Sequence, residues 1–438
     1  MRVTRRQFLK GAAAAGAAVS LGEATRVPRA GARPGALPAP NASGVDHIVV
    51  VCMENRSFDH YLGWVPGADG RQAGLSYRDD AGEWHDTHHL TDWSGCGFND
   101  PDHSVTGGRL QLDGGRCDGF RRGANDDYAL GYYTREDLPT NAFLVDNFTV
   151  CDRWFCGILG PTYPNRFYTH AATTDRLDNT STTSTLPTIW DRLSAAGVSA
   201  TYYFSDLPFL ALWGQKYIST SQPVAAFFAD AAAGTLPSFS YLDPFFLGEG
   251  QGGSNDDHPH ADIRRGQAFL ADVVRAVMGG PLWQKTMLLI TYDEWGGFFE
   301  HVPPPRMPDR TGPAVAPLQL GQTGFRVPGY IVSPFARRGA VDSTVLNHGS
   351  IAALLEWRFG LKALQPRDAA SANPARLLEF SRRNPTEASA VPTVVDPGPH
   401  LCVSNSAVGV DAPAGMANTE VFWEELAASP LMKGWDRV

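Results

Sequence analysis

The chain has no cluster of basic residues, no Cys-x-x-Cys pair and no internal repeat. Its formal net charge of −9 argues against a nucleic-acid partner and against tight electrostatic docking on an anionic membrane. A zwitterionic lipid surface would not repel it, so transient contact with a membrane surface stays open. The missing Cys-x-x-Cys pair argues against a thiolate zinc site. The 43% hydrophobic and 11% aromatic residues are typical of a globular chain.

Cysteines are few, and their number fits an oxidising destination. A pairing of Cys96 with Cys117 and a pairing of Cys151 with Cys156 are both open to such a chain, and the sequence does not assign the connectivity. Cys52 lies within an apolar run, which indicates a small buried side chain. The sixth cysteine, Cys402, has no partner suggested by spacing.

The N-terminal segment has the pattern of an export signal. Arg5 and Arg6 are followed by Phe8, Leu9 and Lys10, and then by an alanine-rich stretch that is too short and too weakly apolar to be a good membrane span. This is the twin-arginine pattern. We therefore expect a twin-arginine signal peptide and linker over residues 1–44, and one domain with long loop insertions over 45–438. The expected partner is the twin-arginine export machinery, and the expected location is secreted, periplasmic or cell-surface.

Two apolar runs, Ile48–Cys52 and Met287–Tyr292, predict strands buried on both faces, as in a parallel sheet. The first ends on Glu54-Asn55 and the second on Asp293-Glu294. A strand that delivers such groups at its carboxyl end is how an open α/β sheet builds a ligand site. Two adjacent buried acids carry a heavy desolvation cost unless a cation or hydrogen-bond donors compensate it. The alternative for Glu54 and Asn55 is that they cap the following helix, predicted over Phe58–Leu62.

Thr162 stands in the turn Gly160-Pro161-Thr162-Tyr163-Pro164, and Asn165 is predicted to be the N-cap of the helix that follows. A hydroxyl just before a helix N-terminus lies where free backbone N–H groups and the helix dipole favour an anion. That setting suits a nucleophilic alkoxide or a phosphoryl oxygen. The alternative is an ordinary threonine in a rigid proline turn.

Three histidines lie close to predicted strand ends or helix starts: His103, His258 and His348. With a divalent metal ion held by Glu54, Asn55, Thr162, Asp293 and Glu294, the oxygen of Thr162 would become an alkoxide more easily. The chemistry that follows is in-line attack on phosphorus, a covalent phospho-threonine and its hydrolysis by water. The sequence favours His258 as the group that protonates the leaving alcohol.

Five motifs together resemble a known family: MENRSFDHYLG, GPTYPNRFY, NDDHPHADIRRGQ, YDEWGGFFEHVPPP and NHGSIAALLEWRFG. In this order, from about His47 to Leu361, they are similar to the bacterial phosphoesterase family of phospholipases C and acid phosphatases, within the alkaline phosphatase superfamily. The resemblance implies an α/β fold, an αβα sandwich with a mostly parallel central sheet. It also implies a metal held by Glu54, Asn55, Asp293 and Glu294, with Thr162 as the nucleophile. The family histidines that surround the phosphate correspond to His103, His258 and His348.

Within that family the sequence favours an exported, metal-dependent phospholipase C-like enzyme acting on phosphatidylcholine or a related phospholipid. One alternative is an acid phosphatase that uses the same site on phosphomonoesters, and another is a non-catalytic secreted binding protein. Two departures bear on substrate choice: Val105 stands where many members carry an aromatic residue, and Glu300 replaces a commoner Asp. Four loop aromatics suit either contact with a choline or ordinary packing, with packing favoured: Trp64, Trp93, Trp154 and Tyr163.

Overall fold

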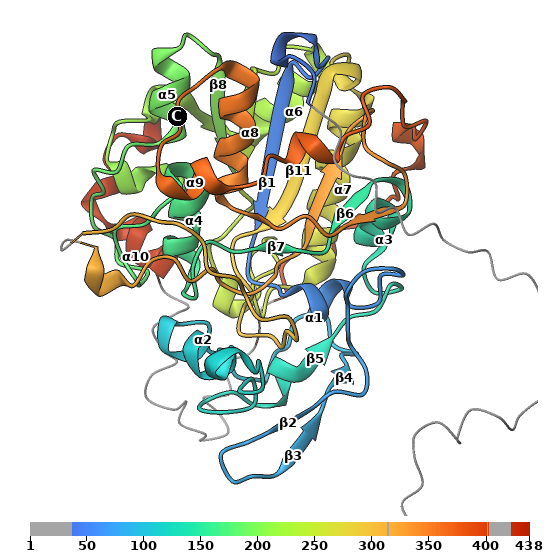
Figure 1. Ribbon diagram of the computed structural model, residues 1–438, viewed down its shortest axis with the longest axis vertical. Helices are drawn as coiled ribbons and strands as arrows, with labels where there is room; N and C mark the ends of the chain where they lie inside the picture. The colour runs from blue at the N-terminus through green and yellow to red at the C-terminus, as the bar shows by residue number, and fades with distance from the viewer. Residues whose placement is uncertain (1–36, 313–314, 401, 403–421) are drawn as a thin grey trace, which may run out of the picture.

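The structure, a computed structural model, describes residues 37–312, 315–400, 402 and 422–438. The predicted signal peptide and most of the predicted linker lie outside the described residues. Between these limits the chain forms a layered α/β fold around one large sheet (Figure 1). The prediction of a single domain over residues 45–438 stays a prediction.

The central sheet has eight strands in the order β13-β6-β12-β11-β1-β10-β8-β9. All of its strands are parallel to one another except β12, which is antiparallel to both of its neighbours. The predicted mostly parallel sheet is therefore confirmed. Its strands are β1 (His47–Met53), β6 (Thr149–Cys151), β8 (Ala200–Phe204), β9 (Ser221–Pro223), β10 (Phe239–Leu242), β11 (Thr286–Tyr292), β12 (Gly329–Val332) and β13 (Ala340–Asp342).

Strand β1 lies at the centre because its residues are apolar on both faces. It pairs with β10 on one side and β11 on the other, and Val49 is opposite both Ser240 and Leu288. Nearly every residue of β1 and all of β11 are buried, as their continuous apolar runs predict. Both strands run in the same direction, so their carboxyl ends open at the same edge of the sheet.

Helices cover both faces of the sheet (Figure 1). One layer contains α4, α5, α8 and α9, and the other contains α3, α6 and α7. The predicted αβα sandwich is confirmed. The helices are α1 (Phe58–Leu62), α2 (Val105–Leu112), α3 (Pro139–Asn147), α4 (Thr162–Ala171), α5 (Ile189–Ala195), α6 (Val224–Ala233), α7 (Ile263–Gly279), α8 (Gly349–Phe359), α9 (Pro366–Ala370) and α10 (Phe422–Ala428).

A long insertion, residues 64–133, lies beyond the carboxyl ends of β1 and β11, and it includes α2 (Figure 1). It contains a small antiparallel hairpin of β2 (Ser76–Arg78) and β3 (Trp84–Asp86). It also contributes β4 (His88–His89), which pairs with β5 (Gly131–Tyr132). The insertion therefore lies at the edge where a ligand site is expected.

The disulfide of the described residues joins Cys96 to Cys402, with a sequence separation of 306. Both pairings suggested by spacing are therefore wrong. Cys117, Cys151 and Cys156 are free and buried, and burial raises their thiol pKa values, so they pack as small apolar side chains. The bond ties the C-terminal segment to the insertion that covers the carboxyl edge of the sheet.

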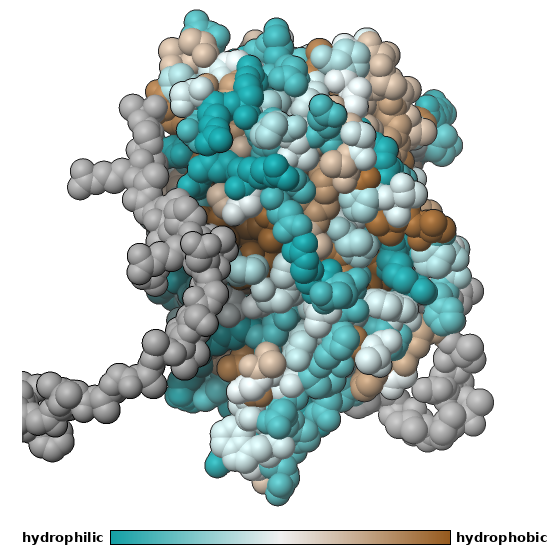
Figure 2. Space-filling view, turned by 90° about the vertical axis from the view of Figure 1, so that its right-hand side faces the viewer, coloured by the Kyte–Doolittle hydropathy of each residue, from teal (hydrophilic) through white to brown (hydrophobic). Residues whose placement is uncertain are grey.

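Much of the surface is hydrophilic. On the face in Figure 2, hydrophilic side chains surround smaller apolar patches near the middle. Large apolar side chains that are clearly exposed in the described ranges are Trp84, Phe98, Val345 and Val395. No helix in the described part of the chain combines the length and apolar character needed to cross a membrane. Two of the loop aromatics, Trp154 and Tyr163, are fully buried, in line with packing.

Candidate active site

Arg166 on α4 connects the acids that the sheet delivers from three strands. Its guanidinium is fully buried and donates through Nε to Glu54 Oε1 at 3.0 Å and to Asp293 Oδ2 at 3.2 Å. Its Nη1 donates to Asp243 Oδ1, which follows β10, at 2.6 Å. A single cation thus holds three buried carboxylates in one place. The predicted convergence of Glu54 with Asp293 is present in the structure.

The ends of β1 and β11 are locked together by backbone contacts. Asn55 has a left-handed backbone, with φ of 59°, and its N–H donates to Asp293 Oδ1 at 3.2 Å. Gly296 must be glycine, because a Cβ there would lie 2.0 Å from the carbonyl oxygen of Asn55. Neither Glu54 nor Asn55 caps α1, since Ser57 accepts the bond from the N–H of His60 instead. Their alternative role as capping residues is therefore wrong.

Thr162 is the first residue of α4, and its Oγ is buried with no hydrogen-bond partner among the described residues. It lies four residues before Arg166, so the two side chains share one face of the helix. The Thr162 hydroxyl is therefore carried on the same helix face that holds Glu54 and Asp293.

The prediction that Asn165 is the N-cap is wrong, because Pro161 occupies that position. Asn165 lies inside the first turn and fastens the loop instead. Its Nδ2 donates to the carbonyls of Gly160, at 2.6 Å, and Pro161, at 3.1 Å, and its Oδ1 accepts from the N–H of Ile158 at 3.0 Å. The turn that carries Thr162 is therefore held rigidly.

His103 and His258 meet edge to face, with their ring centroids 5.7 Å apart. In each ring Nδ1 contacts a backbone carbonyl at 2.8 Å, that of Pro101 for His103 and that of Pro259 for His258. A carbonyl only accepts, so Nδ1 carries the hydrogen in both rings. Nε2 of each ring is therefore free to face an acid. Nε2 of His103 lies 3.8 Å from Glu294 Oε1, and Nε2 of His258 faces an acid from the segment between β10 and α7.

That second acid is Glu249, on a short 3₁₀ helix (Glu249–Gln251), and the sequence analysis missed it. Its Oε1 lies 3.8 Å from Nε2 of His258, and its own two carboxyl oxygens have no hydrogen-bond partner in the described ranges. Glu54, Glu249 and His258 can bring one ligand atom each within 4.8 Å of one another. Nothing in the glycine-rich sequence around Glu249 distinguishes it from a solvated loop acid.

The two facing histidines have opposite charge preferences. Burial acts to lower the pKa of His103, but the carboxylates of Glu294 and Asp100 raise it to about 9. Burial lowers the pKa of His258 well below its ordinary value, and the charge of His103 lowers it further. Burial raises the pKa of Glu294 to about 8 and that of Asp293 to about 6. At neutral pH, His103 is the charged ring and His258 the neutral one.

His348 is near the site but has no free nitrogen. Its Nε2 is 2.5 Å from the carbonyl of Asp293, and its Nδ1 accepts from the indole N–H of Trp154 at 3.3 Å. Burial lowers the pKa of His348 to about 4, so the ring is neutral. This arrangement lets His348 support the backbone that carries Asp293.

Unsatisfied polar atoms gather at this site. Buried side-chain atoms without a hydrogen-bond partner in the described residues include Glu54 Oε2, both amide atoms of Asn55, Thr162 Oγ and Glu294 Oε1. Buried polar groups are normally paired, so this set is costly unless a ligand completes it. Carboxylate, amide and hydroxyl oxygens form the hard donor set that suits a divalent cation. Of the predicted ligands, Glu54 lies in a described group of acids and histidines whose ligand atoms come within 4.8 Å of one another, with Glu249 and His258, whereas Asp293 and Glu294 lie in no such group.

Comparison with known proteins gives the family. A model of the phosphoesterase family matches residues 45–362. The chain belongs to the phosphoesterase family. This phosphoesterase is therefore a hydrolase acting on phosphoric ester bonds. A model of the twin-arginine signal sequence matches residues 2–22, which confirms the predicted signal and export by that route.

Curated relatives of this phosphoesterase include bacterial and plant proteins. Phospholipase C B of Mycobacterium tuberculosis is 32% identical over 450 residues, covering 82% of each chain. Non-specific phospholipase C6 of Arabidopsis thaliana is 32% identical over 372 residues, covering 75% of this chain and 71% of that protein. Among solved structures, a protein of the alkaline phosphatase superfamily from Vibrio parahaemolyticus has a TM-score of 0.33 and 11% identity, covering 78% of this chain and 76% of that one.

Proposed function

We propose that this phosphoesterase is an exported phosphodiesterase of the phospholipase C type. Its substrate would be phosphatidylcholine or a related phospholipid, and its products diacylglycerol and a phosphorylated head group. The resemblance to proteins named phospholipase C over most of the chain supports this substrate class. The observation that carries the chemistry is the unpartnered, buried hydroxyl of Thr162, held at a helix N-terminus above acids that Arg166 collects.

We assign the metal ligands to Glu54, Asn55, Thr162, Asp293 and Glu294. A divalent cation there would offset the buried negative charge and favour the ionised form of the Thr162 hydroxyl. Asp293 already accepts hydrogen bonds at both carboxyl oxygens, so its orientation is fixed before an ion binds. Arg166 fixes the orientation of Glu54 in the same way.

In the proposed reaction, the Thr162 hydroxyl first loses its proton to solvent, and the ionised Oγ then forms a bond to phosphorus as the bond from phosphorus to the diacylglycerol oxygen breaks. The leaving oxygen takes a proton from a histidine. Nε2 of His103 faces Glu294 at 3.8 Å, and the acids beside His103 raise its pKa, whereas burial lowers the pKa of His258. We therefore assign the proton donor to His103 and not to His258, which the sequence favoured. Water then attacks phosphorus and releases Thr162, and neutral His258 is placed to accept the proton of that water. At the end of the cycle the two histidines regain their starting protonation states by proton exchange with solvent. Two histidines with opposite charge preferences suit these complementary roles.

The test is a comparison of two soluble substrates with protein purified without chelator. We expect p-nitrophenylphosphorylcholine, a diester, to be hydrolysed faster than p-nitrophenyl phosphate, a monoester. A strong preference for the monoester would instead establish an acid phosphatase. No hydrolysis of either substrate, with metal bound, would favour a non-catalytic binding protein.

The covalent step has its own measurement. After rapid quenching during turnover, mass spectrometry of the peptide that contains Thr162 should show one added phosphoryl group on that residue. The sample should be quenched while turnover is under way and the release of the first product shows a burst. Finding no phosphorylated peptide in that sample would contradict the phospho-threonine.

A further inference from the structure

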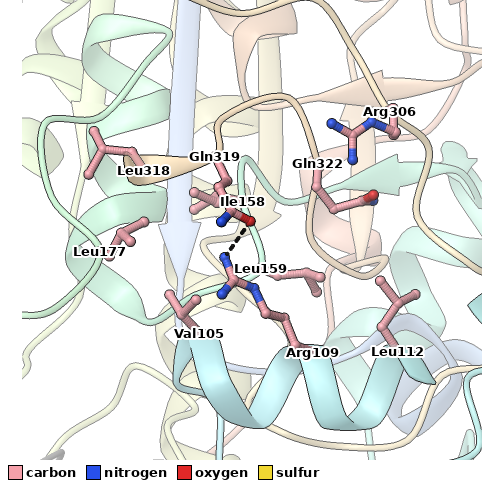
Figure 3. A pocket seen from close by; sticks show the side chains of 10 residues that line it. All are labelled: Val105, Arg109, Leu112, Ile158, Leu159, Leu177, Arg306, Leu318, Gln319 and Gln322. Carbon is pink, nitrogen blue, oxygen red and sulfur yellow. Dashed lines mark hydrogen bonds between the residues drawn. The ribbon is translucent and has the colours of Figure 1, made fainter. Parts of the chain in front are cut away.

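A pocket of about 410 Å³ lies beside the proposed catalytic centre, between α2 and the loop after β11 (Figure 3). This volume is within the range of about 300–1,000 Å³ that is typical of small-molecule sites. We refer to it as the α2 pocket. Its apolar walls are formed by Val105, Leu112, Ile158, Leu159, Leu177 and Leu318.

Two segments that line the α2 pocket lead directly to residues of the proposed catalytic centre. Val105, Arg109 and Leu112 lie on one face of α2, at spacings of four and three residues, and α2 begins two residues after His103. On the opposite wall, Ile158 and Leu159 belong to the loop that runs directly into Thr162. Val105 also lies against the loop that carries Thr162, since its Cγ2 is 3.0 Å from the position that a Cβ of Gly160 would take. The α2 pocket is therefore next to the segment that carries the proposed nucleophile.

The walls of the α2 pocket include aliphatic side chains that do not serve the protein core. Leu177 and Leu318 are only partly buried, and they belong neither to the buried core nor to the residues packed against it. Figure 3 shows both at the same end of the pocket as Val105. Aliphatic groups that line a hollow and face water gain free energy when an apolar ligand covers them.

Two arginines and two glutamines stand around the same pocket. Arg109 donates to the side-chain oxygen of Gln319 at 3.3 Å (Figure 3). The exposed guanidinium of Arg306 has no hydrogen-bond or ion-pair partner in the described part of the chain, and Gln322 lies beside it in Figure 3. Cationic and amide donors at the rim of an aliphatic hollow are complementary to ester carbonyl oxygens on an aliphatic chain.

The chemistry of the pocket distinguishes between the two ends of a phospholipid. A choline group is recognised by aromatic faces, and none of the described residues that line the α2 pocket is aromatic. Two guanidinium groups would repel a quaternary ammonium. An acyl chain needs no aromatic face, and its ester linkage carries no positive charge for the guanidinium groups to repel.

We propose that the α2 pocket binds an acyl chain of a lipid phosphodiester, with the ester carbonyls directed toward Arg109 and Arg306. This assignment rests on the proposed function, because it takes phosphorus to lie at Thr162. It places the diacylglycerol part of the substrate on the α2 side of the nucleophile and leaves the head group to another part of the site.

The first experiment measures kcat/KM for monomeric short-chain phosphatidylcholines with increasing acyl length. We expect a rise of up to about fourfold for each added CH₂ until the pocket is filled, because that is the factor for burying one methylene. The chain-free diester p-nitrophenylphosphorylcholine gives the baseline. A kcat/KM that does not change with chain length overturns the assignment.

The second experiment fills the pocket with Leu177→Trp, a residue outside the proposed catalytic machinery. The matched control is Val395→Trp, at an aliphatic residue that is 78% exposed on the surface. In Leu177→Trp the increase with chain length should be lost, with kcat/KM on the chain-free diester kept within about twofold. Equal losses on both kinds of substrate, or no loss on either, would contradict a separate chain-binding wall.

The two proposals fail in different ways. If the wild-type protein hydrolyses no phosphodiester, the proposed function is wrong. If it hydrolyses the chain-free diester and long-chain lipids, but Leu177→Trp has the same chain-length dependence as Val395→Trp, only the acyl assignment is wrong.

Discussion

Two groups of buried polar side chains lie around the turn from β1 to α1, and they differ in how many of their polar atoms are paired within the chain. In the first, which we call the ion-pair cluster (Asp59, Glu300, His301 and Arg326), Arg326 Nη2 donates to Glu300 at 2.7 Å and to Asp59 at 3.1 Å, and His301 Nδ1 lies 2.5 Å from Asp59. Backbone N–H groups, including that of Val302, supply further donors.

In the second, which we call the site cluster (Glu54, Thr162, Glu249, His258 and Glu294), every member has at least one buried polar atom without a partner in the described ranges. Buried acids occur in both clusters, so burial of charge alone does not mark a functional site. The ion-pair cluster also has two unpartnered buried atoms in the described ranges, Glu300 Oε2 and Arg326 Nε. The difference is that each of its acids is paired with the cluster's own arginine or histidine. The site cluster needs something that the chain does not supply, which is the feature expected of a binding centre.

The largest effect is expected for Thr162→Ala in the site cluster. Removing the nucleophile should lower kcat by about 10⁴-fold. The thermal unfolding midpoint should change by no more than about 2 °C, because the hydroxyl makes no hydrogen bond in the folded protein. Steady-state assay with p-nitrophenylphosphorylcholine and a melting curve give the two numbers. Activity near that of the wild type would remove Thr162 from the mechanism.

Arg326→Met should lower the free energy of unfolding without changing metal binding at the site cluster. It removes the cation of the ion-pair cluster and leaves two buried acids without their partner, at a cost of about 3 kcal/mol or more. Urea unfolding measures the change in the free energy of unfolding. The fraction that stays folded should keep its bound metal, and a stability equal to that of the wild type would mean that the two clusters do not differ as described.

Asp293→Asn should act on metal content. Replacing one carboxylate oxygen by an amide weakens both the proposed ion site and the contact with Arg166, and we expect activity to fall by about 100-fold. Elemental analysis of protein purified without chelator measures bound metal per chain. Wild-type protein treated with chelator serves as the control. Equal metal content in the variant and the wild type would contradict the ligand assignment.

A smaller effect, of opposite sign, is expected for Glu249→Gln in metal-free protein. Burial and the nearby carboxylates of Glu54 and Asp256 raise the pKa of Glu249 well above its ordinary value, so the charged form is disfavoured in the folded protein. At alkaline pH, where Glu249 is ionised, replacing it by a neutral amide should raise the free energy of unfolding by about 1 kcal/mol. Melting curves after chelator treatment measure this gain. A destabilised variant would show that Glu249 is paired in the folded protein, as the acids of the ion-pair cluster are.

The smallest effect concerns pH. Burial raises the pKa of Glu300 from 4.5 to about 7, with Arg326 opposing the rise. The folded state therefore binds this proton more tightly than the unfolded state does. The stability that comes from protonated Glu300 is fully present below about pH 4.5 and is lost as the pH rises through about 7. Glu300→Gln should flatten that decline, measured as unfolding midpoints between about pH 5 and pH 8, and an unchanged slope would refute it.

Much of the fold follows from local sequence. The runs 48–52 and 287–292 are apolar without alternation, and only a strand covered on both faces buries every residue of such a run. The acids at their carboxyl ends then have to converge, because parallel strands open at one edge. Thr162 was recognisable for a similar local reason, since prolines and a glycine fix its turn.

What the sequence does not predict depends on contacts between distant segments. The bond between Cys96 and Cys402 spans 306 residues, and no spacing rule reaches that far. Asn165 was misplaced because both Pro161 and Pro164 are tolerated in the first turn of a helix, which lets α4 begin earlier than the asparagine suggests. Glu249 is recognisable only once the folded chain places it beside His258.

The disulfide also bears on whether folding or oxidation of the cysteines comes first. The twin-arginine route carries folded chains out of a reducing compartment, so the two sulfur atoms are brought together by the finished fold before any oxidant reaches them. The covalent link is then a fastening added after assembly, closing a structure that had already formed without it. The bond therefore stabilises the enzyme mainly after export, when it is oxidised.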